Sequence, residues 1–235
     1  MSDTLAGRLQ VVRAAIDDAL ARSGRPAGSV RLVAVSKKQP ASAIAEAYAA
    51  GQRDFGENYV QELEAKAREL EALGDLRWHV IGALQRNKAK DVVRVAHVLH
   101  TIDSALLAQE VAKRAAAASR VVEVLIEVDL AGETQKAGCA PAGVAALATA
   151  CAGAGLAVIG LMAIPPASDD PEATRPYFAQ LRALRDELVA AGHTTVVELS
   201  MGMSHDFPIA VEEGATIVRV GSAIFGSRPA LRPAV

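Results

Sequence analysis

Short apolar runs alternate with longer segments of helical periodicity along the whole chain, and this alternation limits the possible folds more than any other feature. Eight short apolar runs have the length of buried strands, although periodicity alone supports the second and the fourth only weakly. They cover residues 31–36, 54–57, 78–82, 98–102, 122–129, 157–162, 196–200 and 216–220. The predicted helices lie before, between and after these runs, at about 4–24, 40–51, 59–73, 85–95, 104–118, 140–154, 171–191 and 206–213.

Eight strands alternating with helices in 235 residues predict an α/β fold, a (β/α)8 TIM barrel. An open doubly wound sheet is the alternative, but it normally uses fewer strands, and no GxGxxG turn follows the first run here. No linker, low-complexity stretch or sequence repeat divides the chain. We therefore expect a single domain over residues 1–235, with an N-terminal helix within 1–24 and a short tail at 227–235.

Composition excludes several classes of protein. Hydrophobic residues make up 51% and charged residues 22%, which is enough to bury a core and argues against disorder. Aromatic residues are only 3%, the net charge is −2 and no basic block stands out, so we expect neither nucleic-acid nor membrane binding. Without a signal-peptide pattern or an apolar stretch of about 18 residues, the chain is expected to be cytoplasmic.

Cysteine and histidine usage predicts no disulfide framework and no metal site. The two cysteines, Cys139 and Cys151, are too few for a disulfide scaffold and fit a reducing compartment. The five histidines form no HExxH or CxxC-type ligand set.

The chemistry of a TIM barrel lies at the carboxyl ends of its strands, so the residues that follow each run are the candidates. Two glycine- and serine-rich segments, 200–204 and 221–226, follow the last two runs. Small residues let backbone N–H groups approach an anion, and the hydroxyls of Ser204 and Ser222 add donors. Tight turns would explain the glycines equally well, but their position after these two strands favours a phosphate site.

Two lysines, Lys37 and Lys38, follow the first run. Strand alternation directs one of them into the barrel mouth, although alternation alone does not decide which one, because both faces of this strand are apolar. A desolvated lysine amine is suited to Schiff-base chemistry. Two solvated lysines at a strand end are the commoner situation.

Arg219 lies inside the last apolar run. A guanidinium in a barrel strand needs a partner, which is either a nearby carboxylate or an acceptor on a ligand. A phosphate site, a Schiff-base lysine and an arginine in one barrel together suggest pyridoxal 5′-phosphate (PLP). Arginine can only donate hydrogen bonds, so it would keep the pyridine nitrogen of PLP unprotonated.

Eight motifs extend this reading over almost the whole chain. They are LVAVSKKQP (32–40), FGENYVQE (55–62), WHVIGALQRNK (78–88), HTIDS (100–104), ETQKAG (133–138), GLMAIP (160–165), LSMGMSHD (199–206) and VRVGSAIFG (218–226). By these motifs the chain resembles the YggS/PROSC family of pyridoxal phosphate homeostasis proteins. Proteins of this family look like the N-terminal barrel domain of alanine racemase standing alone.

The resemblance assigns roles to the candidate residues. It implies that Lys37 forms the Schiff base, that Arg219 faces the pyridine nitrogen and that Asn58 lies near the ring. It implies further that Ser204, Gly221 and Ser222 hold the phosphate, that Gly202 shapes their loop, and that Met201 and Ile81 pack around the cofactor. Lys136 matches a second family lysine near the barrel mouth; a solvated loop lysine is the alternative.

The resemblance also implies a carrier without catalytic residues, which buffers PLP and passes it to apo-enzymes. The chain ends soon after the eighth strand, so we do not expect the second domain of the racemases, and we expect a monomer. A racemase-type PLP enzyme is the alternative, with Tyr59 or His205 as the second acid/base group. A third hypothesis is an aldolase-like barrel, in which Lys37 attacks a sugar phosphate without a cofactor.

Overall fold

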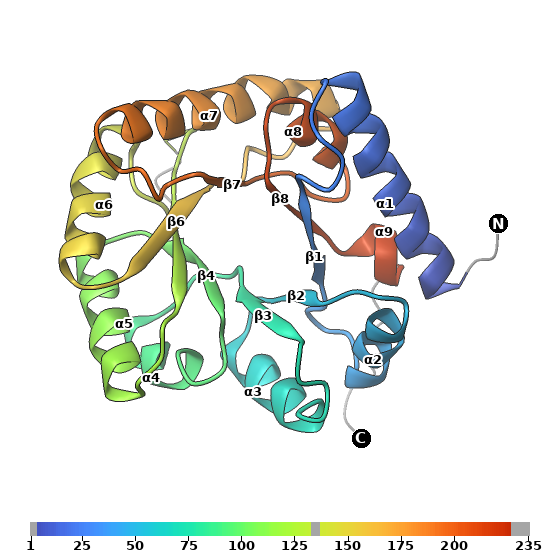
Figure 1. Ribbon diagram of the computed structural model, residues 1–235, viewed down its shortest axis with the longest axis horizontal. Helices are drawn as coiled ribbons and strands as arrows, with labels where there is room; N and C mark the ends of the chain where they lie inside the picture. Colours follow the sequence, from blue (N-terminus) through green and yellow to red (C-terminus); the bar gives the residue numbers. More distant parts are fainter. Residues whose placement is uncertain (1–3, 133–136, 227–235) are drawn as a thin grey trace.

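The computed structural model describes residues 4–132 and 137–226, and in it eight parallel strands close into a barrel with the helices outside (Figure 1). Each strand pairs with the next, and the last pairs with the first. The strands are β1 (Arg31–Val35), β2 (Asp54–Glu57), β3 (Arg77–Val80), β4 (Val98–Ile102), β5 (Glu123–Glu127), β6 (Ala157–Met162), β7 (Glu198–Ser200) and β8 (Ile217–Val220). All eight predicted strands are present, so the predicted barrel fold is confirmed.

The helices surround the barrel in chain order (Figure 1). They are α1 (Leu5–Arg22), α2 (Ala41–Ala49), α3 (Val60–Glu69), α4 (Ala89–Val92), α5 (Ala105–Ala117), α6 (Val144–Gly153), α7 (Arg175–Ala190), α8 (Phe207–Glu212) and α9 (Ser222–Phe225). Short 3-10 turns precede three of them, at Arg86–Lys88, Pro141–Gly143 and Pro171–Thr174. The helix predicted over 85–95 is in fact such a turn followed by the single turn of α4, and α9 was not predicted as a helix.

Apolar side chains fill both faces of the strands, as parallel sheets require. A small cluster of Val33, Val98, Leu125, Met162 and Ile217 lies apart from the large cluster that joins the strands to the helices. No helix of the described residues is long and apolar enough to span a membrane.

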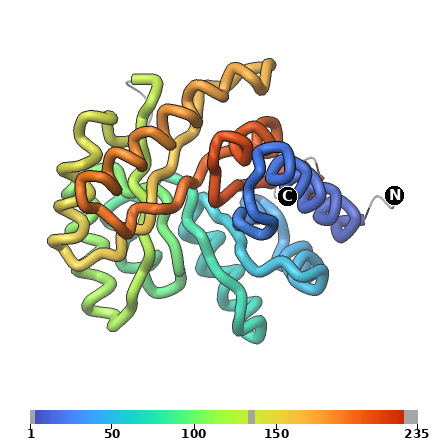
Figure 2. Tube along the Cα trace, turned by 45° about the horizontal axis from the view of Figure 1, so that its top comes forward, coloured from blue at the N-terminus to red at the C-terminus, as the bar shows by residue number. Residues whose placement is uncertain are grey.

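Helix α1 covers the region where the barrel closes. The Thr4 hydroxyl accepts a hydrogen bond from Gly7 N, which caps the first turn. Helix α1 packs on α8 and α9, two elements from the other end of the chain (Figure 2), and its apolar stripe is buried. Arg8 Nε also donates to Ile224 O at 2.7 Å, so α1 contacts the helix that follows β8 directly.

Candidate functional site

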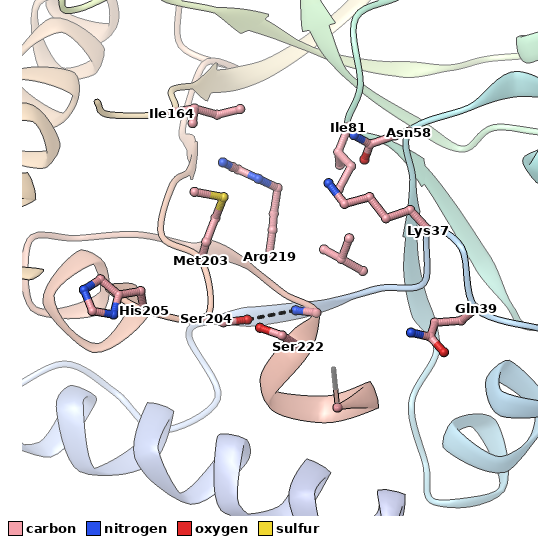
Figure 3. Close-up of a pocket in the computed structure, with 13 residues that line it drawn as sticks. Lys37, Gln39, Asn58, Ile81, Ile164, Met203, Ser204, His205, Arg219 and Ser222 are labelled. Carbon is pink, nitrogen blue, oxygen red and sulfur yellow. Dashed lines mark hydrogen bonds between the residues drawn. The ribbon is translucent and has the colours of Figure 1, made fainter. Parts of the chain in front are cut away.

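A cavity of about 290 Å³ lies at the carboxyl ends of the strands (Figure 3). Its lining comes from the ends of β1, β2, β3, β6, β7 and β8 and from the loops that follow them. The lining residues are Val35, Lys37, Gln39, Asn58, Ile81, Ile164, Met203, Ser204, His205, Arg219, Gly221, Ser222 and Gly226. The cavity thus combines one lysine, one arginine, two serines and an apolar rim.

Of the two lysines that follow β1, Lys37 is the one that lines the cavity. Its side chain extends toward Asn58 and Ile81 (Figure 3). The next residue, Lys38, has φ 62, in the left-handed region that side chains other than glycine rarely adopt. Its backbone N–H donates to Glu62 Oε2 at 2.7 Å, which holds the turn in this conformation.

A buried ion cluster lies under this turn. Lys66 is only 7% exposed, and its Nζ donates to Ser36 O, Glu57 Oε1 and Glu62 Oε2 at 2.8, 2.8 and 3.0 Å. Burial raises the pKa of Glu57, although hydrogen bonds from Lys66 and Ser36 oppose this effect. Burial would raise the pKa of Glu62 as well, but the bonds from Lys38 N and Lys66 outweigh it and lower that pKa. Lys66 and Glu62 therefore hold the backbone on both sides of Lys37.

The glycine- and serine-rich segments that follow β7 and β8 meet at one end of the cavity. Gly221 N donates to Ser204 Oγ at 3.2 Å, and Ser222 begins α9 (Figure 3). A side chain at Gly221 would place its Cβ 3.2 Å from Val35 O, so glycine allows the backbone at 221 to lie this close to β1. Gly202 has φ +89, and a Cβ there would lie 2.5 Å from the Cβ of Ala210. Gly202 therefore permits the turn that brings Ser204 to the cavity.

Arg219 reaches the cavity from inside β8 and is 3% exposed. Its Nη1 donates to Ser200 Oγ at 2.6 Å and its Nη2 to Ala163 O at 3.1 Å. Burial lowers the pKa of Arg219 to about 10, while the charges of Glu127 and Asp206 oppose the shift. The guanidinium is therefore still protonated at neutral pH and acts only as a donor.

Asn58 brings an unused acceptor to the cavity. Its Oδ1 is buried and has no hydrogen-bond partner among the described residues. A buried amide oxygen without a donor costs about 1–3 kcal/mol. A ligand that carries a hydroxyl group at this position would remove that cost.

The structure brings six of the predicted site residues to the cavity: Lys37, Asn58, Ser204, Arg219, Gly221 and Ser222, and the predicted packing residue Ile81 joins them. It does not bring Met201, whose side chain is fully buried in the main apolar cluster, or Gly202. The predicted packing of Met201 against the cofactor stays a prediction, and Met203 is the methionine that lines the cavity. Of the two acid/base candidates, His205 is a lining residue and Tyr59 is not. Lys136 lies outside the described residues.

Sequence reasoning missed Gln39, Ile164 and Met203. Ile164 follows the end of β6, so the rule that located the other residues would have found it if applied to that strand as well. Within the described ranges, no group of three or more His, Cys, Asp or Glu side chains could hold a metal ion.

Comparison with known proteins gives consistent results over almost the whole chain. The family model of the alanine racemase N-terminal domain matches residues 11–229. The pyridoxal phosphate homeostasis protein of Aquifex aeolicus is 44% identical over 94% of this chain and 97% of its own. That of Escherichia coli K12 is 43% identical over 95% of this chain and 97% of its own.

Solved structures agree with the sequence comparisons. PipY of Synechococcus elongatus, solved with PLP bound, is 42% identical, has a TM-score of 0.84, and covers 95% of this chain and 100% of its own. PipY without PLP gives a TM-score of 0.85 at the same identity. D-threonine aldolase of Filomicrobium marinum, at 18% identity and a TM-score of 0.71, shares the barrel fold.

Proposed function

Because this chain belongs to the pyridoxal phosphate homeostasis protein family, we propose that it binds PLP in the cavity at the barrel mouth and buffers or supplies it to apo-enzymes. The observation that carries the proposal is the convergence of Lys37, Arg219 and the serine–glycine loops on one cavity. When bound, PLP supplies an aldehyde that condenses with a primary amine, and Lys37 is the amine that lines the cavity.

The residues present fit each part of this cofactor. Gly221 lines the cavity without a side chain of its own, and the hydroxyls of Ser204 and Ser222 add donors for a phosphate. The unpartnered Oδ1 of Asn58 would accept from a ring hydroxyl. Arg219 would donate to the ring nitrogen and keep it unprotonated, which weakens the ring as an electron sink.

The carrier role is favoured over catalysis by the composition of the cavity. Racemisation needs a positioned proton donor or acceptor on each face of the ring. Opposite Lys37, the titratable side chains of the described lining are His205 and the donor-only Arg219. His205 is exposed, and its Nε2 contacts Asp169 O at 3.2 Å. We propose accordingly that the protein is not an amino-acid racemase.

We further propose a cytoplasmic monomer that meets apo-enzymes transiently. The residues that would hold PLP all come from one chain, and both cysteines are free thiols, as in a reducing compartment. Light scattering of the purified protein tests the oligomeric state, and a dimer mass would overturn that part of the proposal.

The test of the function is the visible spectrum during titration with PLP, followed by borohydride reduction and peptide mass mapping. We expect a band that disappears on reduction and a pyridoxyl adduct on Lys37. Lys37→Ala should abolish the adduct. The matched control is Lys38→Asn, because asparagine tolerates the left-handed backbone of that position, and it should leave the adduct intact.

Three results would contradict the proposal in different ways. An adduct on another lysine would reject the role of Lys37. Amino-acid racemisation that depends on Lys37 would reject the non-enzymatic role. The absence of any band at excess PLP would reject the cofactor and favour the aldolase hypothesis, which cleavage assays with sugar phosphates would then test.

A further inference from the structure

Buried polar side chains form one continuous row of hydrogen bonds through the barrel interior. Asp54 Oδ1 contacts His79 Nε2 at 2.9 Å, and His79 Nδ1 contacts His100 Nε2 at 2.9 Å. His100 Nδ1 then contacts Ser200 Oγ at 2.8 Å, and Ser200 Oγ accepts from Arg219 at 2.6 Å. The two histidines and the serine are 0% exposed. The row begins at the amino-terminal end of β2 and ends at the cavity.

The two ends of this row fix the direction of every hydrogen bond in it. Arg219 can only donate, and the ionised carboxylate of Asp54 can only accept. Burial would raise the pKa of Asp54, but the bond from His79 and the charges of Arg31 and Arg77 lower it, so the carboxylate stays ionised. His79 Nε2 must therefore carry the hydrogen that points at Asp54.

The same logic sets the protonation of the inner residues. Burial lowers the pKa of His79 and, much further, that of His100, so both rings are neutral and have one donor and one acceptor each. With its Nε2 donating to Asp54, His79 accepts at Nδ1 from the Nε2–H of His100. His100 then accepts at Nδ1 from the Ser200 hydroxyl, whose oxygen is left to accept from Arg219. All of these polar atoms are satisfied only in this arrangement.

We propose that Asp54, His79, His100 and Ser200 form a positioning relay that aims the Arg219 guanidinium at the cofactor. This inference rests on the proposed function, because it assigns the relay to the group that would face the ring nitrogen. The aligned dipoles of the relay present lone pairs to Arg219 and so stabilise its buried positive charge. The bonds to Ser200 and to Ala163 O fix the guanidinium plane, and Arg219 has further N–H groups for the cavity (Figure 3).

The relay makes a prediction that does not depend on PLP. Nitrogen NMR of the histidine side chains in the ligand-free protein should show His79 and His100 as neutral rings protonated on Nε2. Removal of the Asp54 acceptor by Asp54→Ala should disturb this state in both rings. A Nδ1–H tautomer of either histidine in the wild type would overturn the relay.

A second measurement connects the relay to the cavity. Ser200→Ala removes the hydrogen bond to a charged donor, so PLP affinity should fall about tenfold or more, with a shifted absorbance maximum and the adduct still on Lys37. Asp54→Ala, at the far end of the row, should shift the absorbance in the same direction. Glu123→Ala is the matched control, because Glu123 pairs with Arg77 near Asp54 but lies outside the relay, and it should change neither readout.

The outcomes separate the relay from the proposed function. If the wild type gives no PLP band, the proposed function fails, and the NMR result still decides whether the relay exists. If the wild type binds PLP and both Ser200→Ala and Asp54→Ala match it in affinity and absorbance, the relay has no positioning role. If Asp54→Ala does not fold, His79→Gln interrupts the row one step further in and is expected to give the same spectral shift.

Discussion

Glu127 is a buried residue whose ionisation should affect the stability of the fold. It ends β5, is 9% exposed, and its Oε2 has no hydrogen-bond partner in the described part of the chain. Burial raises the pKa of Glu127 to about 7; the charge of Arg219 opposes this shift and that of Asp103 adds to it. The carboxyl is therefore easier to ionise in the unfolded chain than in the native barrel.

This difference predicts a loss of stability with rising pH. A carboxyl whose native pKa is raised favours the fold at acidic pH, and that contribution is lost as the pH rises from the unfolded pKa, about 4.5, through about 7. Glu127→Gln removes the titration, so relative to the wild type the variant should gain about 2–3 kcal/mol between about pH 5 and pH 8. Urea unfolding at several pH values measures this change. Glu123→Gln on the same strand is the control, and parallel curves for the wild type and Glu127→Gln would contradict the prediction.

At the residue scale, most of the cavity residues could be predicted from the sequence, because the parallel strands all end at the mouth of the barrel. The sequence did not indicate Met203, because alternation stops when the chain leaves β7, where Gly202 adopts φ +89. The roles of His79 and His100 could not be predicted either. Their contact depends on the β3–β4 register and on the barrel interior, which spacing along the chain does not contain.

At the element scale, the strands were predictable because both of their faces are buried. Even the weak run at 54–57 is a strand, since its neighbours β1 and β3 pair with it in register. Helix α9 could not be predicted, because four residues have no helical stability of their own. Its conformation depends on contacts with α1, such as that of Arg8 with Ile224 O.

The turn between β1 and α2 also depends on a neighbouring helix, because Glu62 and Lys66 of α3 hold its backbone. This dependence leads to a prediction about stability. Lys66→Met keeps the length of the side chain but leaves the buried carboxylate of Glu57 without its cation, so unfolding should become easier by about 3–5 kcal/mol. The double variant Lys66→Met/Glu57→Gln should recover part of this loss. Urea unfolding measures both variants.

Lys113→Met provides the control for this experiment, because Lys113 is an exposed lysine on α5. Its replacement should change the free energy of unfolding by less than about 0.5 kcal/mol. If Lys66→Met is no more costly than Lys113→Met, the cluster does not hold the turn. The adduct on Lys37 should also form more slowly in Lys66→Met than in the control, since the backbone on both sides of Lys37 loses its anchors.

At the scale of the whole molecule, α1 belongs to the closed barrel. It precedes β1 in the chain but packs on α8 and α9, which flank β8, so it links the two ends of the barrel across the β1–β8 pairing (Figures 1 and 2). The proposal of a single domain therefore implies that a destabilising substitution in α1 also destabilises strands beyond the β1–β8 pairing, such as β3.

Leu9→Ala tests this implication. Leu9 is 0% exposed on α1, so its truncation should cost about 2–5 kcal/mol, whereas Val11→Ala, at a position 51% exposed on the same helix, should cost little. The single tryptophan, Trp78, is buried in β3, and its fluorescence reports on the strands while circular dichroism reports mainly on the helices. In one cooperative domain both signals of Leu9→Ala shift together to lower denaturant. A helical signal that is lost first, with the Trp78 transition unchanged, would show that α1 unfolds as a separate unit and that the barrel closes without it.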